Sequence, residues 1–243
     1  MCTLSWRLTE NKYEVFFNRD EQRSRAKATV PRYDDNTNSI YPLDPDGGGT
    51  WISVNRSGLT LCLLNNYQAQ SENKDISFRH SRGQIILKLT GYDNAKEIES
   101  MLRKLDLGSY APFLLCIFTQ SLITYEGGVL VFSWNGKSLN KSVQKQPLIS
   151  SSVSLEEVTA NRQSLFSDMV LDVNADTESH LNYHCSHSPD RGKLSVCMHR
   201  SDAATQSLSH IAVAEHIKFS YHDGSPCKNS NWSDMLMPPV TMN

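Results

Sequence analysis

The second residue of the chain, Cys2, could act as a nucleophile if Met1 is removed. Removal would leave a thiol and a free α-amine on one residue, with ordinary pKa values of about 8.5 and about 7.7–8.0. The amine can then accept the proton of its own side chain near neutral pH, which activates a weak nucleophile. The pattern allows covalent catalysis by Cys2, but a cysteine at position 2 also occurs without any such role.

Two predicted strands position this cysteine. Apolar and polar residues alternate from Cys2 to Leu8, and a polar turn leads to a second strand over residues 13–17. A hairpin of this length returns the end of the second strand to the start of the first. The sequence Asn-Arg-Asp-Glu at residues 18–21 follows the end of the second strand and is therefore expected beside Cys2.

Three features together resemble the NRDE family, which includes the transport and Golgi organisation protein 2 homologues. They are the Met-Cys-Thr start, the run at residues 18–21, and Gly-Gly-Thr-Trp at residues 48–51. The resemblance extends firmly to about Tyr67 and more loosely beyond. It implies a branch of the N-terminal nucleophile (Ntn) hydrolase fold, whose cysteine members include penicillin V acylases and bile salt hydrolases.

The order of predicted elements is strands, helices, strands, a helix and strands, which is not the alternation of a parallel sheet. With the resemblance, this order implies an α+β fold, a four-layer αββα sandwich of two antiparallel sheets flanked by helices. The strands are expected at residues 51–55, 59–64, 113–118, 129–134, 194–198, 207–214 and 216–221. The helices are expected at residues 84–90, after a cap at Asp93, and after a capping box formed by Ser154 and Glu157. Residues 31–46 and 68–80 are expected as loops, and residues 223–243 as a turn-rich segment on the surface.

The resemblance implies a catalytic set of Cys2, Arg19, Asp20 and Asn66. Cys2 would attack an amide carbonyl, Asp20 would orient the α-amine, and Arg19 would lower the thiol pKa or hold a substrate carboxylate. Asn66 would donate to the oxyanion, an effect worth about 3–4 kcal/mol in such sites. The assignment among Arg19, Asp20 and Glu21 stays open, because related acylases space these residues differently.

Four further residues are expected to bind substrate: Asn18, Trp51, Asn65 and Ser151. Ser151 occupies the position that the family gives to an asparagine, and a hydroxyl reaches less far than an amide. The basic run at residues 22–25 is either a solvated turn or an anion-binding rim. The predicted function is hydrolysis of a C–N amide bond in a small substrate. The alternative is a non-catalytic carrier of a haem or lipid-related ligand that keeps the pocket.

A cluster of His180, His184, Cys185 and His187 raises the question of a zinc site. The spacing matches no zinc motif and no carboxylate completes a catalytic site, so a polar surface segment is the expectation. No metal and no cofactor are expected.

Composition limits the remaining possibilities. A chain of 243 residues with 39% hydrophobic residues suits a single domain over residues 1–243. The net charge of −2 gives no reason to expect nucleic acid or an anionic membrane as partner, and the oligomeric state stays open. No apolar run approaches the roughly 18–20 residues of a membrane span, and Arg7, Glu10 and Lys12 interrupt any signal sequence. Six cysteines without framework spacing suit reduced thiols, so a cytoplasmic location is expected.

Overall fold

The structure is a computed structural model that describes the chain except for residues 11, 72–77, 120–127, 172–174, 229–230 and 238–243. Within the described residues, the strands form two antiparallel sheets of six and seven strands. The six-stranded sheet has the order β10-β1-β2-β11-β12-β13 and the seven-stranded sheet has the order β3-β4-β5-β6-β7-β8-β9.

The strands of the six-stranded sheet are β1 (Cys2–Leu8), β2 (Tyr13–Gln22), β10 (Leu148–Ser150), β11 (Ala203–Val213), β12 (Ile217–Asp223) and β13 (Trp232–Met237). Those of the seven-stranded sheet are β3 (Arg32–Asp34), β4 (Ser39–Tyr41), β5 (Ile52–Asn55), β6 (Thr60–Asn65), β7 (Phe113–Phe118), β8 (Val129–Trp134) and β9 (Leu139–Gln144). The helices are α1 (Tyr67–Ser71), α2 (Gly83–Leu89), α3 (Ala95–Leu102), α4 (Leu155–Phe166) and α5 (Thr177–Cys185), with a 3₁₀ turn at Leu107–Ser109 and a π-helical turn at Ser167–Leu171.

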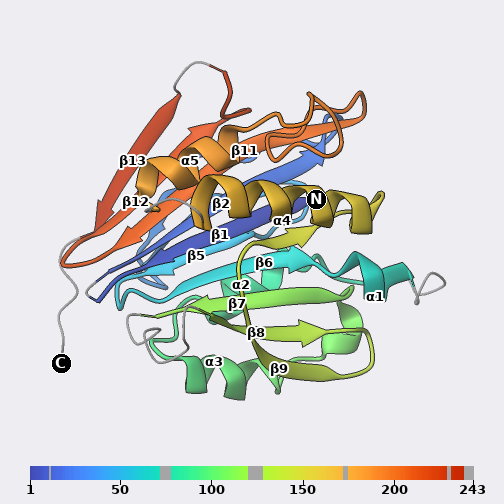
Figure 1. Ribbon diagram of the computed structural model, residues 1–243. Coiled ribbons are helices and arrows are strands. Elements are labelled where there is room, and N and C mark those ends of the chain that lie inside the picture. The colour runs from blue at the N-terminus through green and yellow to red at the C-terminus, as the bar shows by residue number, and fades with distance from the viewer. Residues whose placement is uncertain (11, 72–77, 120–127, 172–174, 229–230, 238–243) are drawn as a thin grey trace.

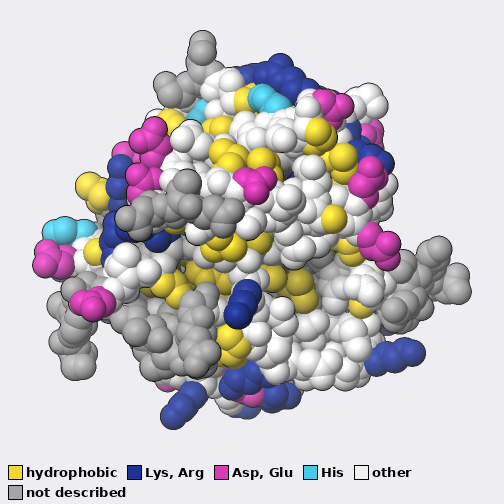
Figure 2. Space-filling model, viewed as in Figure 1, with side chains coloured by type: hydrophobic (Ala, Val, Ile, Leu, Met, Phe, Trp, Pro, Cys, Tyr) yellow, Lys and Arg dark blue, Asp and Glu magenta, His cyan; other side chains and the backbone are white. Residues whose placement is uncertain are grey.

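The elements stack in four layers (Figure 1). Helices α4 and α5 lie over β1, β2 and β11, while α2 and α3 lie beyond the second sheet. This arrangement confirms the predicted α+β sandwich of two antiparallel sheets between helical layers. Seen from the side of α4 and α5, both acidic and basic side chains appear on the surface (Figure 2), as expected for a chain with a net charge close to zero.

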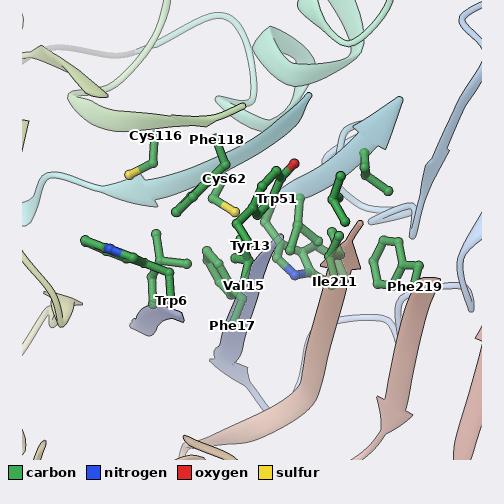
Figure 3. Packing of buried hydrophobic residues seen from close by; sticks show 14 of the residues in the cluster. Trp6, Tyr13, Val15, Phe17, Trp51, Cys62, Cys116, Phe118, Ile211 and Phe219 are labelled. Carbon is green, nitrogen blue, oxygen red and sulfur yellow. The ribbon is translucent and has the colours of Figure 1, made fainter. Parts of the chain in front are cut away.

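The largest apolar cluster lies between the two sheets (Figure 3). Trp6 and Val15 of the first sheet face Cys62 and Phe118 of the second, and all four side chains are fully buried. The rings of Trp6 and Phe118 meet edge to face with their centres 5.6 Å apart. Such aromatic pairs add about 0.5–1.5 kcal/mol beyond the area they bury.

Alternation along β2 sends every second side chain to the helical layer instead. Phe16 stacks on His180 of α5 with ring centres 4.7 Å apart. His180 and His184 are buried, and both rings lie 2.9 Å from the hydroxyl of Ser5. The expectation that residues 180–187 form a polar surface segment is therefore wrong for these two histidines, because α5 turns them toward the sheet.

The hairpin of β1 and β2 has the predicted form, with Cys2 directly opposite Arg19. The second strand continues to Gln22, so residues 18–21 are part of the sheet and do not follow the end of the strand as predicted. The predicted strands at residues 113–118 and 129–134 are confirmed as β7 and β8. Residues 194–198 form no regular strand, although Val196, Cys197 and Met198 are buried.

Two predicted loops contain strands. Residues 31–46 include the edge hairpin of β3 and β4, and the segment after residue 223 includes β13, which pairs with β12 along six residues. Of the predicted loop at 68–80, the beginning belongs to α1, and residues 72–77 lie outside the described part. β3 and β4 have only three residues each, and β13 buries only Met237, so none of the three shows the apolar alternation that marks a half-buried strand.

Two helix caps differ from the prediction. Asn94, not Asp93, caps α3 by accepting from the backbone N–H groups of Lys96 and Glu97. Ser154 precedes α4 in a left-handed conformation and makes no capping hydrogen bond. Its hydroxyl and the carboxylate of Glu157 both accept from Lys193, so the predicted capping box is wrong.

Candidate active site

Cys2 lies between two neighbouring strands at one end of the six-stranded sheet. It is directly opposite Arg19 on β2 and Ser150 on β10, and directly opposed residues of antiparallel strands point to the same face. The three side chains therefore face the second sheet together. Cys2 is 9% exposed and reaches a cavity of about 120 Å³. A space of that size holds a small group and is below the usual range of a ligand site, about 300–1,000 Å³.

The cavity draws its walls from both sheets and from the start of α2. The residues that line it are Met1, Cys2, Arg19, Asp20, Glu21, Arg25, Asp44, Gly49, Thr50, Trp51, Leu63, Asn65, Ser81, Arg82 and Gly83. Met1 is one of them and is 7% exposed, with its side chain packed against Val158, Met198 and Ala203. Removal of Met1 would therefore enlarge the cavity on the side next to Cys2.

The alternation of β2 divides the four residues of the Asn-Arg-Asp-Glu run. Arg19 and Glu21 interact with each other on the cavity side, with Arg19 Nη2 3.3 Å from the Glu21 carboxylate. Asn18 faces α5, where its Nδ2 donates to the carbonyl oxygens of His184 and Val196 at 2.8 and 3.1 Å. Asn18 thus fastens the helical layer to the sheet and does not enter the cavity.

Arg19 is held in place by three contacts. Its guanidinium lies over the ring of Trp51, 4.5 Å from the centroid, and donates to Asp44 at 3.2 Å as well as to Glu21. Arg25 also binds Asp44, at 2.8 Å, and lines the cavity. Residues 22–25 were expected to form either a solvated turn or an anion-binding rim. The position of Arg25 in the cavity wall favours the rim for this residue. Acidic partners already balance much of the charge of both arginines.

Arg82 is a further cation in the cavity wall. It donates from Nη1 to Gln70 Oε1 and to the carbonyl oxygen of Pro112, both at 3.1 Å. Among the described residues, no carboxylate lies within ion-pair distance of it. Burial lowers the pKa of Arg82, which reflects the cost of holding this charge away from water. Nothing in the local sequence indicated this residue, because the fold alone brings it to Cys2.

Of the two asparagines at the end of β6, Asn65 lines the cavity. Its Nδ2 donates to the hydroxyl of Tyr67 at 2.7 Å, and its carbonyl oxygen accepts from Ser150 at 2.8 Å. Asn66 does not line the cavity, and its Oδ1 accepts from the backbone N–H of Ala69 at the start of α1. Asn65 therefore reaches the cavity beside Cys2, whereas Asn66, the residue expected to donate to the oxyanion, caps the turn into α1.

Ser151 is also displaced from the cavity. Its hydroxyl donates to the carbonyl oxygen of Val153 at 2.5 Å, and its side chain borders a separate surface depression with Tyr67 and Leu155. Ser150 takes the place beside Cys2 instead. A shift of one residue along a strand turns a side chain to the other face, so Ser150, and not Ser151, lies in register with Cys2.

Asp20 lies beside the cavity, but its carboxylate is bound on the helix side. Arg162 of α4 lies 3.4 Å from one carboxylate oxygen, and the Thr205 hydroxyl donates to the other at 2.6 Å. Both charged side chains are fully buried. Sequence reasoning missed Arg162, although it lies four residues after Val158 and four before Phe166, on the apolar face of the helix.

The main chain of Asp20 meets the first residue of the chain. The ammonium of Met1 donates to the carbonyl oxygen of Asp20 at 3.1 Å, and the N–H of Asp20 donates to the carbonyl oxygen of Met1 at 2.9 Å. Burial raises the pKa of the Cys2 thiol, while the nearby ammonium and Arg19 oppose that rise. Burial also raises the pKa of the Asp20 carboxyl, against the charge of Arg162. With Met1 in place, the thiol of Cys2 is therefore mostly protonated at neutral pH.

The glycine pair before Trp51 serves packing. A Cβ on Gly49 would lie 2.4 Å from the carbonyl carbon of Gly83, and Thr50 donates from its backbone N–H to Gly83 O at 3.1 Å. Only a residue without a side chain lets the segment before β5 approach the start of α2 so closely. This contact brings Arg82 into the cavity wall.

The architecture is that of the Ntn hydrolases. One similar solved structure is a C2A mutant of conjugated bile acid hydrolase from Clostridium perfringens, at 13% identity and a TM-score of 0.55, covering 98% of this chain and 92% of that chain. Another is the Caenorhabditis elegans orthologue of N-acylethanolamine-hydrolyzing acid amidase, at 8% identity and a TM-score of 0.56, covering 98% and 100%. At these identities the likeness shows a shared fold.

A comparison of the sequence with models of protein families assigns the chain to a family. The family model for Transport and Golgi organisation 2 matches residues 1–222, so the chain belongs to that family. A comparison with curated proteins found no match. Among the described residues, no helix has the length and apolar character needed to cross a membrane.

Proposed function

We propose that the protein is an N-terminal-cysteine hydrolase that cleaves the amide bond of a small substrate after Met1 is removed. The observation that carries the proposal is the position of Cys2, at the end of β1 in a cavity shared with Arg19, Asn65 and Arg82. The fold supports it, since both similar structures are of proteins named as hydrolysing enzymes, and one carries a cysteine-to-alanine change at its second residue.

The proposed reaction begins at the Cys2 thiol. The α-amine that Met1 removal leaves on Cys2 takes the thiol proton, and Sγ attacks the carbonyl carbon of the substrate. The amine then delivers the proton to the leaving nitrogen as the C–N bond breaks. Water cleaves the resulting thioester, which releases the acid and restores the thiol. The carbonyl oxygen of Asp20, which accepts from the Met1 ammonium at 3.1 Å, is near enough to orient the new amine.

Asn65 is the proposed oxyanion donor. An amide NH₂ group carries two N–H bonds, and one of those of Asn65 is occupied by the Tyr67 hydroxyl. Among the described residues the second has no partner, so it can donate to the developing oxyanion beside Cys2. The Asn65 main chain is fixed by the hydroxyl of Ser150, which keeps the amide beside the thiol.

Arg82 is the proposed anchor for an anionic group on the substrate. It is the cavity arginine without a carboxylate partner among the described residues, whereas Arg19 and Arg25 are both bound to Asp44. A buried cation without a counter-ion gains more from a bound carboxylate than one that is already paired. Amides that carry a carboxylate close to the scissile bond are thus the preferred substrate class.

The proposal is tested by hydrolysis of an N-acylglycine series and a neutral N-acylethanolamine series, with the released amine as the readout. We expect turnover of the acylglycines by the wild type and by Cys185→Ser, a control at a half-buried cysteine away from the cavity. Cys2→Ala should lose turnover while still binding the substrate. Arg82→Gln should raise KM for the acylglycines more than for the neutral series. Turnover that survives Cys2→Ala would refute the proposal.

A ligand carrier is the second candidate, and one observation favours it. Burial raises the pKa of the Cys2 thiol, which suits a neutral, unreactive thiol in a binding pocket. A haem or lipid-related carrier would show no amide turnover. Binding would be lost in Cys2→Ala if the thiol is a ligand and unchanged if it is not. The single domain over residues 1–243 and the cytoplasmic location stay predictions.

A further inference from the structure

Four side chains that could bind a metal converge near the start of β11, and none of them lines the Cys2 cavity. His187 follows α5, Cys197 and His199 lie in the segment before β11, and Cys227 follows β12. One ligand atom from each residue lies within 4.8 Å of every other. The set shares His187 with the cluster that the sequence suggested, and its other three members were not part of that cluster.

The distances agree with a tetrahedral zinc site. Nε2 of His199 lies 3.3 Å from Nε2 of His187, 3.3 Å from Sγ of Cys227 and 3.6 Å from Sγ of Cys197. A tetrahedron with Zn–N of about 2.0–2.1 Å and Zn–S of about 2.3 Å puts its ligand atoms about 3.3–3.8 Å apart. The three separations from His199 fall at or close to this range, and the remaining pairs of ligand atoms lie within 4.8 Å.

Hydrogen bonding alone does not account for this convergence. A neutral imidazole nitrogen either donates one proton or offers one lone pair, so Nε2 of His199 can satisfy only one of its three close neighbours. Two imidazole nitrogens and two sulfur atoms that share one centre are instead the ligand set of structural zinc.

We propose that His187, Cys197, His199 and Cys227 bind one Zn²⁺ ion in a structural Cys₂His₂ site. On binding, each thiol loses its proton to solvent, so two thiolates balance the two charges of the ion and two protons are released. Arg191, whose Nη2 lies 3.5 Å from Sγ of Cys227, stabilises that thiolate. Four protein ligands leave no open position, which suits a structural role and not a catalytic one.

The site would join three segments that have little regular structure of their own. Cys197 and His199 flank Met198, whose N–H donates to the hydroxyl of Thr205, and Thr205 in turn binds Asp20. Met198 also packs against Met1. A bound ion would therefore stiffen the segment that closes the helix side of the candidate active site. This inference does not depend on the hydrolase proposal, because metal binding is measured without substrate.

The test uses the full-length protein purified under reducing conditions with an affinity tag that contains no histidine. Elemental analysis should find about one zinc per chain, as a single closed site requires. After removal of zinc with a chelator, Co²⁺ should bind in the same ratio and give the visible absorption of tetrahedral cobalt with thiolate ligands.

Variants assign the ligands. Cys197→Ala and Cys227→Ala should each lose the stoichiometric metal, whereas Cys185→Ala, at a neighbouring thiol, and His216→Ala, at an exposed histidine, should keep it. His199→Cys should also keep it, because a Cys₃His set binds zinc. This variant separates lost ligation from lost folding.

Three results would overturn the proposal. The first is wild-type protein that takes up neither Zn²⁺ nor Co²⁺ in stoichiometric amount. The second is metal content that survives in the double variant of Cys197 and Cys227. The third is a disulfide between these two cysteines in protein purified under reducing conditions, since oxidised sulfurs cannot act as thiolate ligands.

Discussion

Replacing Arg162 with methionine removes the only positive charge that the described side chains place against the carboxylate of Asp20. Arg162 also donates to the hydroxyl of Thr3 and to the carbonyl oxygen of Leu194. Methionine keeps a similar apolar length, so the change removes the charge and the hydrogen bonds while leaving little empty space. The affected groups lie directly behind Cys2, on the helix side of the same two strands.

The expected loss of stability in Arg162→Met follows from the burial of the ion pair. Both side chains of the pair are 0% exposed, and loss of one partner of such a pair costs about 3–5 kcal/mol. Without Arg162, the pKa of Asp20 rises further, and protonation of the carboxyl keeps the cost toward the lower end of that range. For a protein of this size, the change corresponds to a fall in Tm of about 6–20 °C.

The assay is urea denaturation followed by circular dichroism at pH 7, with Arg162→Met, Asp20→Asn and the double variant. The double variant should be less destabilised than the sum of the single variants, with a coupling energy of about 1–3 kcal/mol. Arg103→Met is the matched control, because Arg103 binds Glu99 on the surface and is 49% exposed. The control should change stability by less than about 1 kcal/mol.

Two results would refute this reasoning. One is a cost for Arg162→Met no greater than that of the surface control. The other is a double variant as unstable as the sum of its parts, because additivity would mean that Arg162 and Asp20 do not interact.

Two more predictions concern packing and acid stability. Gly49→Ala should lower the free energy of unfolding by about 1–3 kcal/mol, since its Cβ would meet the Gly83 backbone at 2.4 Å, whereas Gly91→Ala, with 3.8 Å of space, should change it little. Equal effects of the two changes in urea denaturation would contradict the close approach. Burial lowers the pKa of His180 to about 4 from its ordinary 6.5, so between these values the unfolded chain binds more protons than the folded one. The free energy of unfolding should therefore fall as the pH drops from 6.5 to 4. His180→Gln should reduce this dependence on pH. An unchanged dependence in the variant would show that other groups cause it.

The elements with a strong apolar pattern could be predicted from the sequence. The run Phe-Leu-Leu-Cys-Ile-Phe at residues 113–118 is a buried strand as expected, and the hairpin returns Arg19 to Cys2. The edge strands β3 and β13 could not be predicted, because most of their side chains meet solvent and need not be apolar, and β4 has only three residues.

The sequence indicated the general location of the candidate site but not which of two neighbouring residues would face the cavity. The hairpin and the family resemblance point to Cys2, Arg19 and Trp51, all of which line the cavity. The choices between Asn65 and Asn66 and between Ser150 and Ser151 each depend on one step of alternation, which only strand pairing fixes. Arg82, just before α2, and Arg162, in α4, are distant from Cys2 in sequence, so their part in the site depends on tertiary packing.

The central claim is that Cys2 becomes an activated N-terminal thiol. It is tested most directly by the intact mass of the purified protein, followed by timed alkylation at neutral pH and peptide mapping. The account predicts loss of one methionine and labelling of Cys2 well before the buried thiols Cys62 and Cys116. A chain that keeps Met1 and whose Cys2 is labelled no faster than Cys116 would contradict it.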